Sequence, residues 1–336
     1  MIEEKTEVPN GRTLAQLIEE YKTDSVSGFK RMRYGTRMNH ENVLRRMSEK
    51  YGHLQISEIR NRTLEEMYQH WGKEGQTISM AHTFMAKLRA VCGYGAGMLD
   101  DMDCNRICMN LSRRRYPMQA KAKESFLTAE MATAIREKAR QIGYFSIALA
   151  QAFQFDCVLR QGDCIGYWVP VTEPGESDVI WGDMKWVRGI RWEEIDENLV
   201  LRHVTSKRGK KLTVPLADAP MVKEELDLTP SWVKTGHGPV IVYEATGKPW
   251  KSTPFRQKWR IIADICGIPK DIKNMDSRSG GISEGTNAGV SLELMRHAAT
   301  HSDISTTQRY SRNSEHKVAE ALRQRVAYRH TKRPID

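Results

Sequence analysis

The sequence contains no run of apolar residues that approaches the ~20 required for a membrane-spanning helix. Its start, MIEEKTEVPN, is polar and charged, so it lacks the apolar segment of a secretory signal peptide. These two absences argue against a membrane protein and against an exported one. We therefore expect a cytoplasmic protein.

Cysteine is also scarce, with six residues scattered through the chain and mostly inside apolar segments. Cys104 and Cys108 share at most one helical face, and no second pair completes a tetrahedral zinc site. Cytosolic thiols of this kind are normally reduced. We therefore expect buried thiols and no bound metal. Internal repeats and low-complexity tracts are absent as well.

Positive charge is in excess. The 52 lysines and arginines outnumber the 42 aspartates and glutamates, which gives a net charge of +10 at pH 7. Both signs of charge are abundant, as is typical of a folded basic protein. The simplest partner for such a protein is an acidic polymer. Nucleic acid fits better than a membrane surface, because the sequence has no basic amphipathic anchor.

With 336 residues, the chain is long enough for two domains with separate cores. After a polar leader, residues 1–12, we predict a helical domain over residues 13–109. Capping boxes at Thr13–Gln16 and Thr63–Glu66 predict the starts of its first and third helices, and the second and fourth are expected from about Arg37 and Ser79. The expected core residues are Leu14, Leu17, Ile18, Tyr21, Val43, Leu44, Met47, Leu64, Met67, Tyr68, Trp71, Met80, Phe84, Leu88 and Val91.

Two basic regions accompany this domain. The cations on its exposed helix faces suit phosphate contacts, although a solvated helix surface would have the same composition. They are Lys30, Arg31, Arg33, Arg37, Arg45 and Arg46. The segment 110–124 follows, and we expect it to be an extended, mobile linker that contacts DNA. Its basic residues are Arg113, Arg114, Arg115, Lys121 and Lys123.

Residues 125–313 are predicted to form the second domain. Thr128 caps a helix that ends near Gln141, and the very apolar segment Tyr144–Phe155 is expected to be the buried central helix. The pattern then changes to strands, which we place at 189–192, 199–201 and 212–216. The last of these closes a hairpin through SKRGK, residues 206–210, whereas 172–185 is expected to be a loop or insertion; helices resume at about 219–226 and 253–266. The predicted fold is mainly α, with a small antiparallel β-sheet in the second domain.

The end of this domain has an unusual composition. Leu292, Met295, Ala298 and Ala299 recur at helical spacing, and the polar sequence THSD, residues 300–303, then breaks the pattern. Ser305, Thr306 and Thr307 are typical of a new helix start, which places Tyr310 on a second short element beside Arg309 and Arg312. A phenol among cations indicates an anion nearby. Alternatively, Tyr310 is a half-buried tyrosine on a basic surface helix.

Five candidate site residues in the second domain are types that bind or attack a phosphodiester, and no pair of carboxylates indicates two-metal chemistry. They are Arg160, Lys207, Arg278, His301 and Tyr310. Taken alone, four of them have a structural interpretation: Arg160 as a helix-end arginine, Lys207 as a hairpin lysine, Arg278 as a loop cation and His301 as a helix-capping histidine. Their joint order and spacing favour a site.

The segment HSDISTTQRY, residues 301–310, resembles the terminal motif of the tyrosine recombinases, or phage-type integrases, in which a histidine precedes the nucleophilic tyrosine by nine residues. Arg278 precedes His301 by 23 residues, as expected for the second family arginine. The segment VLRQGD, residues 158–163, resembles the first arginine motif, with Asp163 as the acid that orients Arg160. Lys207 falls at the position of the family's hairpin lysine, with Lys210 and Lys211 close enough to compete.

One position departs from the family pattern. The second arginine motif normally begins with a histidine three residues before the arginine, and here Met275 takes that place before Arg278. A thioether neither titrates nor donates a hydrogen bond, so any acid–base role at this position is lost or moved.

The resemblance implies a recombinase that needs no cofactor. Tyr310 would form a 3′-phosphotyrosyl bond, Arg160 and Arg278 would bind the nonbridging oxygens, His301 would add a hydrogen bond and Lys207 would protonate the leaving oxygen. The basic residues of the linker, with Lys210 and Lys211, would contact double-stranded DNA. The implied assembly is a homotetramer on specific recombination sites, with accessory DNA-bending proteins as further candidates.

Several readings stay open. A bacterial or phage-encoded enzyme of a mobile element is the leading one; a non-catalytic DNA-binding protein on the same fold and a type IB-like topoisomerase are alternatives. Residues 314–336 are expected to form a helix with Val318, Leu322 and Val326 on one face, either exchanged between subunits or docked on its own domain.

Overall fold

The computed structural model describes residues 11–73, 76–116, 125–231, 234–308, 322–323 and 325–327. The chain divides into two compact units, Met1–Lys121 and Ala122–Asp336. None of the described helices has the length and apolarity that crossing a bilayer demands. Each unit has its own hydrophobic core.

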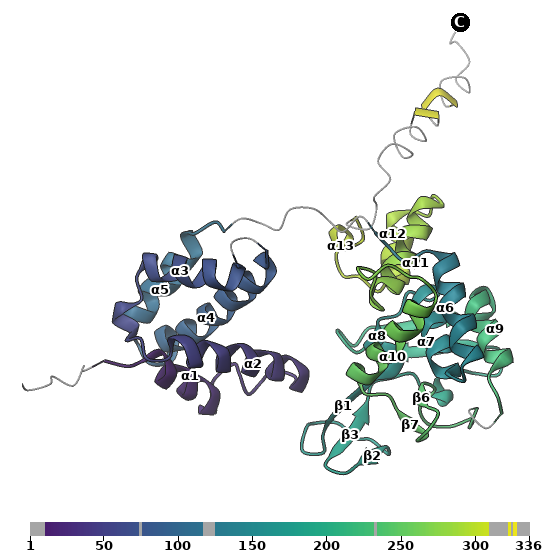
Figure 1. Cartoon of the computed structure of the whole chain (residues 1–336), viewed down its shortest axis with the longest axis horizontal. Coiled ribbons are helices and arrows are strands. Elements are labelled where there is room, and N and C mark those ends of the chain that lie inside the picture. The colour runs from purple at the N-terminus through teal and green to yellow at the C-terminus, as the bar shows by residue number, and fades with distance from the viewer. Residues whose placement is uncertain are drawn as a thin grey trace, which may run out of the picture. The chain divides into compact units, whose positions relative to one another are not determined.

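The first unit is entirely helical among its described residues (Figure 1). Its helices are α1 (Leu14–Thr23), α2 (Tyr34–Tyr51), α3 (Asn61–Gly72), α4 (Ile78–Met98) and α5 (Met102–Arg113). The capping box at Thr13 is confirmed, since Thr13 accepts a hydrogen bond from the backbone N–H of Gln16 and the Gln16 side chain accepts one from Thr13. The predicted core faces are also confirmed, except that Val43 is half-buried and Met80 is 40% exposed.

Two predictions for this unit are wrong. Helix α3 begins at Asn61, so Thr63 lies inside the first turn and accepts a hydrogen bond from the Arg60 N–H instead of capping the helix. Helix α5 was not predicted, and it takes in residues 110–113 of the segment expected to be extended. The Asp101 side chain caps it by accepting from the Cys104 N–H, and Leu111 is buried against the core. Burial of this apolar side chain stabilises a helix that extends into the basic segment.

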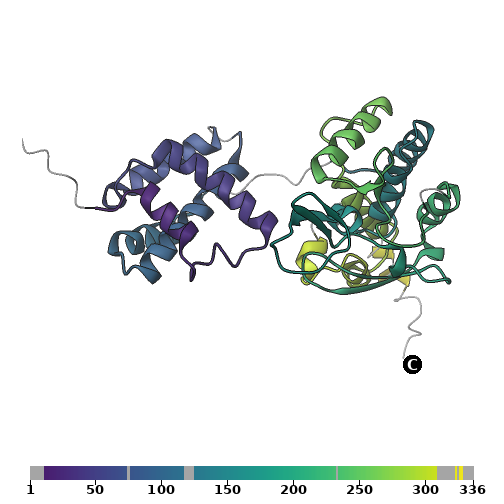
Figure 2. The same cartoon turned by 90° about the horizontal axis from the view of Figure 1, so that it is seen from below.

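The second unit combines helices with three small antiparallel sheets (Figure 2). Its helices are α6 (Ala129–Gln141), α7 (Phe145–Phe155), α8 (Gln161–Ile165), α9 (Pro220–Leu228), α10 (Ser252–Ile265), α11 (Asp276–Asn287), α12 (Leu292–Ala298) and α13 (Ile304–Gln308). Its strands are β1 (Tyr167–Pro170), β2 (Ile180–Trp181), β3 (Met184–Val187), β4 (Val200–Val204), β5 (Lys211–Pro215), β6 (Val242–Tyr243) and β7 (Lys248–Pro249).

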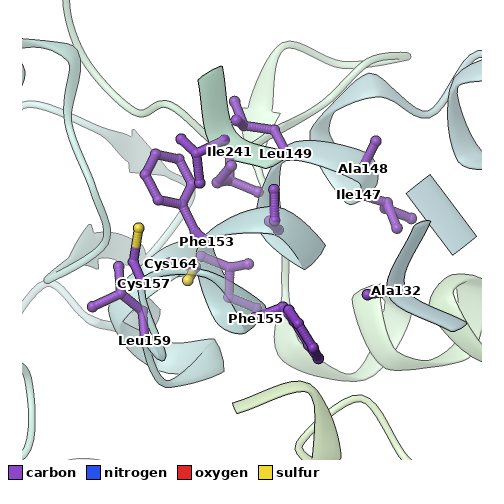
Figure 3. Close-up of a cluster of buried hydrophobic side chains, with 14 of the residues drawn as sticks. Ala132, Ile147, Ala148, Leu149, Phe153, Phe155, Cys157, Leu159, Cys164 and Ile241 are labelled. Carbon is purple, nitrogen blue, oxygen red and sulfur yellow. The ribbon is translucent and has the colours of Figure 1, made fainter. Parts of the chain in front are cut away.

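Helix α7 is the centre of this unit, as the sequence predicts. Every residue from Ser146 to Phe155 is buried, and the helix contacts α6, α8, α9 and α11. Figure 3 shows Phe153 directed toward Ile241, with Cys157, Leu159 and Cys164 gathered where α7 leads into α8. Thr128 caps α6 by accepting from the Met131 N–H, which confirms that helix start. The segment that follows α7 is therefore anchored to a fully buried helix.

The sheets differ in part from the prediction. The β4–β5 hairpin is confirmed, with Arg202 paired to Thr213. The segment 172–185, expected to be a loop, instead contributes β2 and the first half of β3 to a sheet of order β1–β3–β2. Residues 189–192 are not a strand. The prediction failed because the pairing partners of β3 are set by contacts across the sheet and not by local alternation.

Candidate active site

Arg160 is placed by a sharp turn at the end of α7. Val158 has φ 44°, in the left-handed region that a β-branched residue rarely adopts. The Leu159 N–H donates to the Phe153 carbonyl at 3.2 Å, which fixes the turn against α7. Arg160 then occupies the N-cap position of α8. The arginine is thus presented from the rigid end of a buried helix.

Asp163 connects this arginine to the β4–β5 hairpin. Its carboxylate is fully buried, with Oδ2 3.6 Å from Arg160 Nη1. The other oxygen, Oδ1, accepts a hydrogen bond of 2.7 Å from the Ser206 N–H at the base of the hairpin turn. Arg160 also donates to the Thr300 hydroxyl at 3.2 Å. One buried carboxylate therefore sets the position of both the arginine and the hairpin.

The hairpin turn carries the candidate lysines. The Thr205 N–H donates to the Lys210 carbonyl at 2.9 Å, and Gly209 adopts φ 63°, which closes the turn around Lys207. The Lys207 side chain is exposed. Lys210 is half-buried, and its Nζ donates to the His301 carbonyl at 3.2 Å. Lys211 is exposed on β5.

Arg278 lies in the first turn of α11 and joins two backbone segments. Its Nη1 donates to the carbonyl of Val158, and its Nη2 donates to the carbonyl of Ala299. These carbonyls lie two residues before Arg160 and two residues before His301, respectively. Arg278 therefore links the turn that carries Arg160 to the turn that carries His301.

Helix α11 can approach α7 closely because it contains adjacent glycines. A Cβ on Gly281 would overlap the Phe155 carbonyl oxygen, and a Cβ on Gly280 would overlap the Leu127 carbonyl oxygen. Backbone contact of this kind excludes any larger residue. The small cluster of Val158, Ile282, Met295 and Ala299 completes the packing behind the site.

His301 is 6% exposed and follows Thr300, which has φ 52°. Its Nδ1 lies 2.9 Å from the hydroxyl oxygen of the buried Thr307. Burial is the largest cause that lowers the pKa of His301 to about 4, and the positive charges of Arg278, Arg160, Lys210 and Lys207 contribute to the same shift in that order. Each of these four cations therefore lies near enough to His301 to disfavour a charge on its ring. His301 is therefore neutral at pH 7.

The structure thus brings Arg160, Asp163, Lys207, Arg278 and His301 into one region, together with Lys210. Tyr310 lies outside the described residues, as do Arg309 and Arg312; α13 ends at Gln308, two residues before the tyrosine. Met275 is at the N-cap of α11 with 72% of its surface exposed.

The linker residues that we predicted to contact DNA differ in their surroundings. Arg113 is exposed at the end of α5, and Arg115 is exposed beyond it. Arg114 instead contacts its own unit, since it donates to the Asn61 carbonyl at 2.8 Å and pairs with Glu65. Lys121 and Lys123 lie outside the described residues.

Three contributors to the site were missed in the sequence: Thr300, Thr307 and Ser206. Thr307 lies six residues after His301, and Ser206 directly precedes Lys207, but neither has a distinctive pattern. Their roles depend on contacts with residues distant in the chain. Groups of three or more His, Cys, Asp or Glu side chains able to hold a metal do not occur among the described residues.

Comparison with known proteins agrees with this geometry. Residues 185–317 match the model of the phage integrase family. This part of the second unit is therefore similar to the phage integrase family. No curated protein sequence matches it.

Solved structures of tyrosine recombinases have the same fold as this chain. A lambda integrase dimer bound to a COC′ core site superposes with a TM-score of 0.67 at 17% identity, covering 91% of this chain and 79% of that one. The Tn1549 transposon integrase in complex with circular intermediate DNA gives a TM-score of 0.65 at 14% identity, covering 93% and 99%. A lambda integrase tetramer bound to a Holliday junction gives 0.64 at 17% identity, covering 91% and 80%. The mainly α fold with small antiparallel sheets is therefore that of a tyrosine recombinase.

Proposed function

We propose that this protein is a site-specific DNA recombinase that cuts and rejoins DNA through a 3′-phosphotyrosyl intermediate. The observation that carries the proposal is the convergence of Arg160, Arg278 and the lysine hairpin on a buried, neutral His301. A pentavalent phosphorane carries extra negative charge on its nonbridging oxygens. A cluster of fixed cations with a neutral hydrogen-bond donor suits that charge.

The proposed reaction conserves the energy of the phosphodiester. The Tyr310 oxygen attacks the scissile phosphorus and gives up its phenolic proton to water, the bond from phosphorus to the 5′ oxygen breaks, and that oxygen takes a proton from Lys207. In the second step, a 5′-hydroxyl of the partner strand gives its proton to Lys207 and attacks the phosphorus, and the Tyr310 oxygen leaves and takes a proton from water. One phosphoester bond forms for each one that breaks, so the reaction needs no nucleotide hydrolysis as an energy source.

Each proposed role follows from the chemistry of the side chain. Arg160 and Arg278 offer planar forks of N–H donors that match two phosphate oxygens. Arg278 has a second task, because its contacts with the Val158 and Ala299 carbonyls hold both neighbouring turns in place. The Thr307 hydroxyl is proposed to donate to His301 Nδ1, which puts the ring proton on Nε2 for donation to the phosphate.

Lys207 is the proposed general acid, and Lys210 is proposed to contact DNA. The Lys207 side chain is exposed in the turn, which suits contact with a bound strand, and Lys210 is half-buried with its Nζ donating to the His301 carbonyl. Lys211, Arg113 and Arg115 are exposed and suit contacts with the DNA backbone. We also propose that the first unit is the core-binding domain and the second the catalytic domain.

The proposal also covers the DNA substrate and the oligomeric state. The similar solved structures are integrases bound to DNA, one of them as a tetramer on a Holliday junction. We propose a homotetramer on specific sites in double-stranded DNA, acting in integration or excision of a mobile element, with the C-terminal segment 314–336 exchanged between subunits and accessory DNA-bending proteins as further partners.

The test is a nicked DNA substrate that traps covalent protein. Wild-type protein is expected to form an adduct, and Tyr310→Phe, which lacks the nucleophilic oxygen, is expected to form none. Matched hairpin variants, Lys207→Ala and Lys210→Ala, separate the two lysines, since only the first is expected to slow adduct formation by a factor on the order of 10² or more.

The remaining outcomes decide among the alternatives. Adduct formation without strand exchange would identify a type IB-like topoisomerase. Specific DNA binding without any adduct would identify a DNA-binding protein on a recombinase fold. The exposed Met275, which cannot donate a hydrogen bond, is the feature that favours this second outcome.

A further inference from the structure

Residues 167–188 form a segment of the second unit whose two ends lie side by side. The backbones of Gly166 and Gly189 adjoin, so that a Cβ on Gly189 would lie 2.7 Å from the Gly166 nitrogen. The Trp186 ring packs on both glycines, and its Nε1 donates to the Ile165 carbonyl at 2.7 Å. Between these points the chain forms the β1–β3–β2 sheet, which lies at the opposite end of the unit from α12 and α13 (Figure 1). We call residues 167–188 the excursion.

The two ends of the excursion contact the lysine hairpin at the same residue. Arg188 Nη1 donates to the Ser206 carbonyl at 2.8 Å. The Tyr167 hydroxyl lies 3.5 Å from the Ser206 hydroxyl, and its ring covers Gly162 so closely that a Cβ there would overlap it. Ser206 is 4% exposed and directly precedes Lys207.

Hydrogen bonds therefore hold both the N–H and the carbonyl of Ser206. Its N–H donates to the buried carboxylate of Asp163 at 2.7 Å, and its carbonyl accepts from Arg188. Arg188 makes this contact from φ 68°, a left-handed conformation that a non-glycine residue adopts only where its surroundings impose it. The backbone from which the exposed Lys207 side chain extends is held by α8 and by the excursion together.

The charged residues of the excursion make it unsuited to bind the DNA backbone. It contains four carboxylates, Glu173, Glu176, Asp178 and Asp183, against Lys185 and Arg188. Lys185 is buried, with its ammonium group donating to the carbonyls of Val171, Glu173 and Gly175, so it is not presented to a phosphate. The net negative surface would repel a phosphate backbone. The contacts with Ser206 remain as the connection between the excursion and the site.

We infer that Arg188 is a positioning residue for the general acid: its hydrogen bond to the Ser206 carbonyl fixes the base of the hairpin so that the Lys207 ammonium meets the leaving 5′ oxygen. This inference rests on the proposed function. A general acid must come within about 2.6–3.2 Å of the atom that it protonates. A lysine has a long flexible side chain, so a fixed backbone origin restricts the volume that its ammonium samples.

The experiment compares two nicked substrates, an ordinary one and one in which sulfur replaces the bridging 5′ oxygen at the scissile phosphate. A thiolate leaves without protonation because thiols are far more acidic than alcohols. With the ordinary substrate, Arg188→Ala is expected to slow adduct formation by about tenfold, the loss expected when one charge-assisted hydrogen bond no longer holds the acid. With the sulfur substrate, the variant is expected to match wild type within about twofold, as is Lys207→Ala.

Two further variants test whether the loss in rate is specific to the hydrogen bond between Arg188 and Ser206. Arg188→Lys keeps a cationic donor for the Ser206 carbonyl and is expected to recover most of the rate. Arg202→Ala is the matched control, because Arg202 lies on the same hairpin, is 60% exposed and pairs with Asp196 away from the turn. Its rate is expected to equal that of wild type on both substrates. Thermal unfolding of each variant checks that the unit is folded.

Contrary outcomes are distinguishable. An equal loss on both substrates in Arg188→Ala would assign Arg188 to phosphate binding or to folding, and an unchanged rate would remove it from the reaction; either result overturns the positioning role while leaving the recombinase proposal intact. A wild-type protein that forms no adduct with either substrate would overturn both proposals.

Discussion

The hydrogen bond between Thr307 and His301 offers a sharp test of the site. Thr307→Val removes the hydroxyl that lies 2.9 Å from His301 Nδ1 and keeps the branched shape of the side chain. Because Thr307 is fully buried, water has no ready access to replace the lost partner. The ring therefore loses its partner at Nδ1, the contact that we propose selects its tautomer.

The size of the effect follows from burial. Removing one partner from a buried polar group costs ~1–3 kcal/mol, so the unfolding free energy of the second unit is expected to fall by about this amount. The rate of adduct formation on the nicked substrate is expected to fall by about tenfold, corresponding to ~1.4 kcal/mol of lost transition-state stabilisation. The loss in rate arises because Nε2 no longer carries the proton in every molecule.

A double-mutant cycle with His301→Ala isolates this mechanism. If Thr307 acts through the ring, Thr307→Val has no further effect on rate once His301 is alanine. Thr306→Val is the matched control, since it makes the same chemical change at the neighbouring residue, which is only partly buried. A tenfold loss from Thr307→Val that persists in the His301→Ala background would refute the reasoning.

Three further predictions concern the same region. In the free protein, the His301 ring is expected to titrate near pH 4 by NMR, and its pKa should rise when DNA phosphate binds. This pKa lies below the value of about 6.5 in the unfolded chain. The free energy of unfolding should therefore fall as the pH drops from about 6.5 to 4. Gly281→Ala should destabilise the second unit by ~1–3 kcal/mol in urea unfolding, because its methyl group would overlap the Phe155 carbonyl and displace the helix that carries Arg278. Met275→His should raise the adduct rate by about threefold or more without changing stability, because it adds a hydrogen-bond donor at an exposed position one turn from Arg278.

Each of these predictions has a contrary result. A His301 midpoint near 6.5 in the free protein would show that the ring is not buried beside the cations as described. For the glycine, Gly285→Ala is the comparison, because there the new methyl group meets the flexible Met295 side chain instead of backbone. Equal destabilisation by the two alanines would contradict the argument from backbone contact. An unchanged rate in Met275→His would show that the site functions without a donor at this position.

Local signals in the sequence determined much of the architecture. Thr13 and Thr128 each cap the helix that follows them, because a threonine side chain satisfies backbone N–H groups within three residues of itself. The core face of α1 is likewise readable from helical periodicity, and the burial of α7 is readable from its nearly continuous apolar composition. The same kind of signal was present and overlooked at Asp101, the cap of α5.

Elements that depend on distant partners were not readable. Strand β3 pairs with β1 and β2, and nothing within residues 172–185 distinguishes that pairing from a loop. The left-handed conformations of Val158 and Thr300 are imposed by packing and by contacts across the site, not by residue preference. The sequence therefore predicted a hairpin and its lysines, but not the excursion that holds the base of that hairpin.

For the candidate site, the sequence by itself determined which chemical groups are present and in what order: two arginines, a lysine hairpin, a histidine and a tyrosine. Only the tertiary structure decided how the described members of this set meet. Arg160 and Thr300 are 140 residues apart in the chain, and Asp163 and Ser206 are 43 apart, yet each pair is joined by a hydrogen bond. Local preferences act over a few residues, so the convergence of these groups required the cooperative packing of the whole unit around α7.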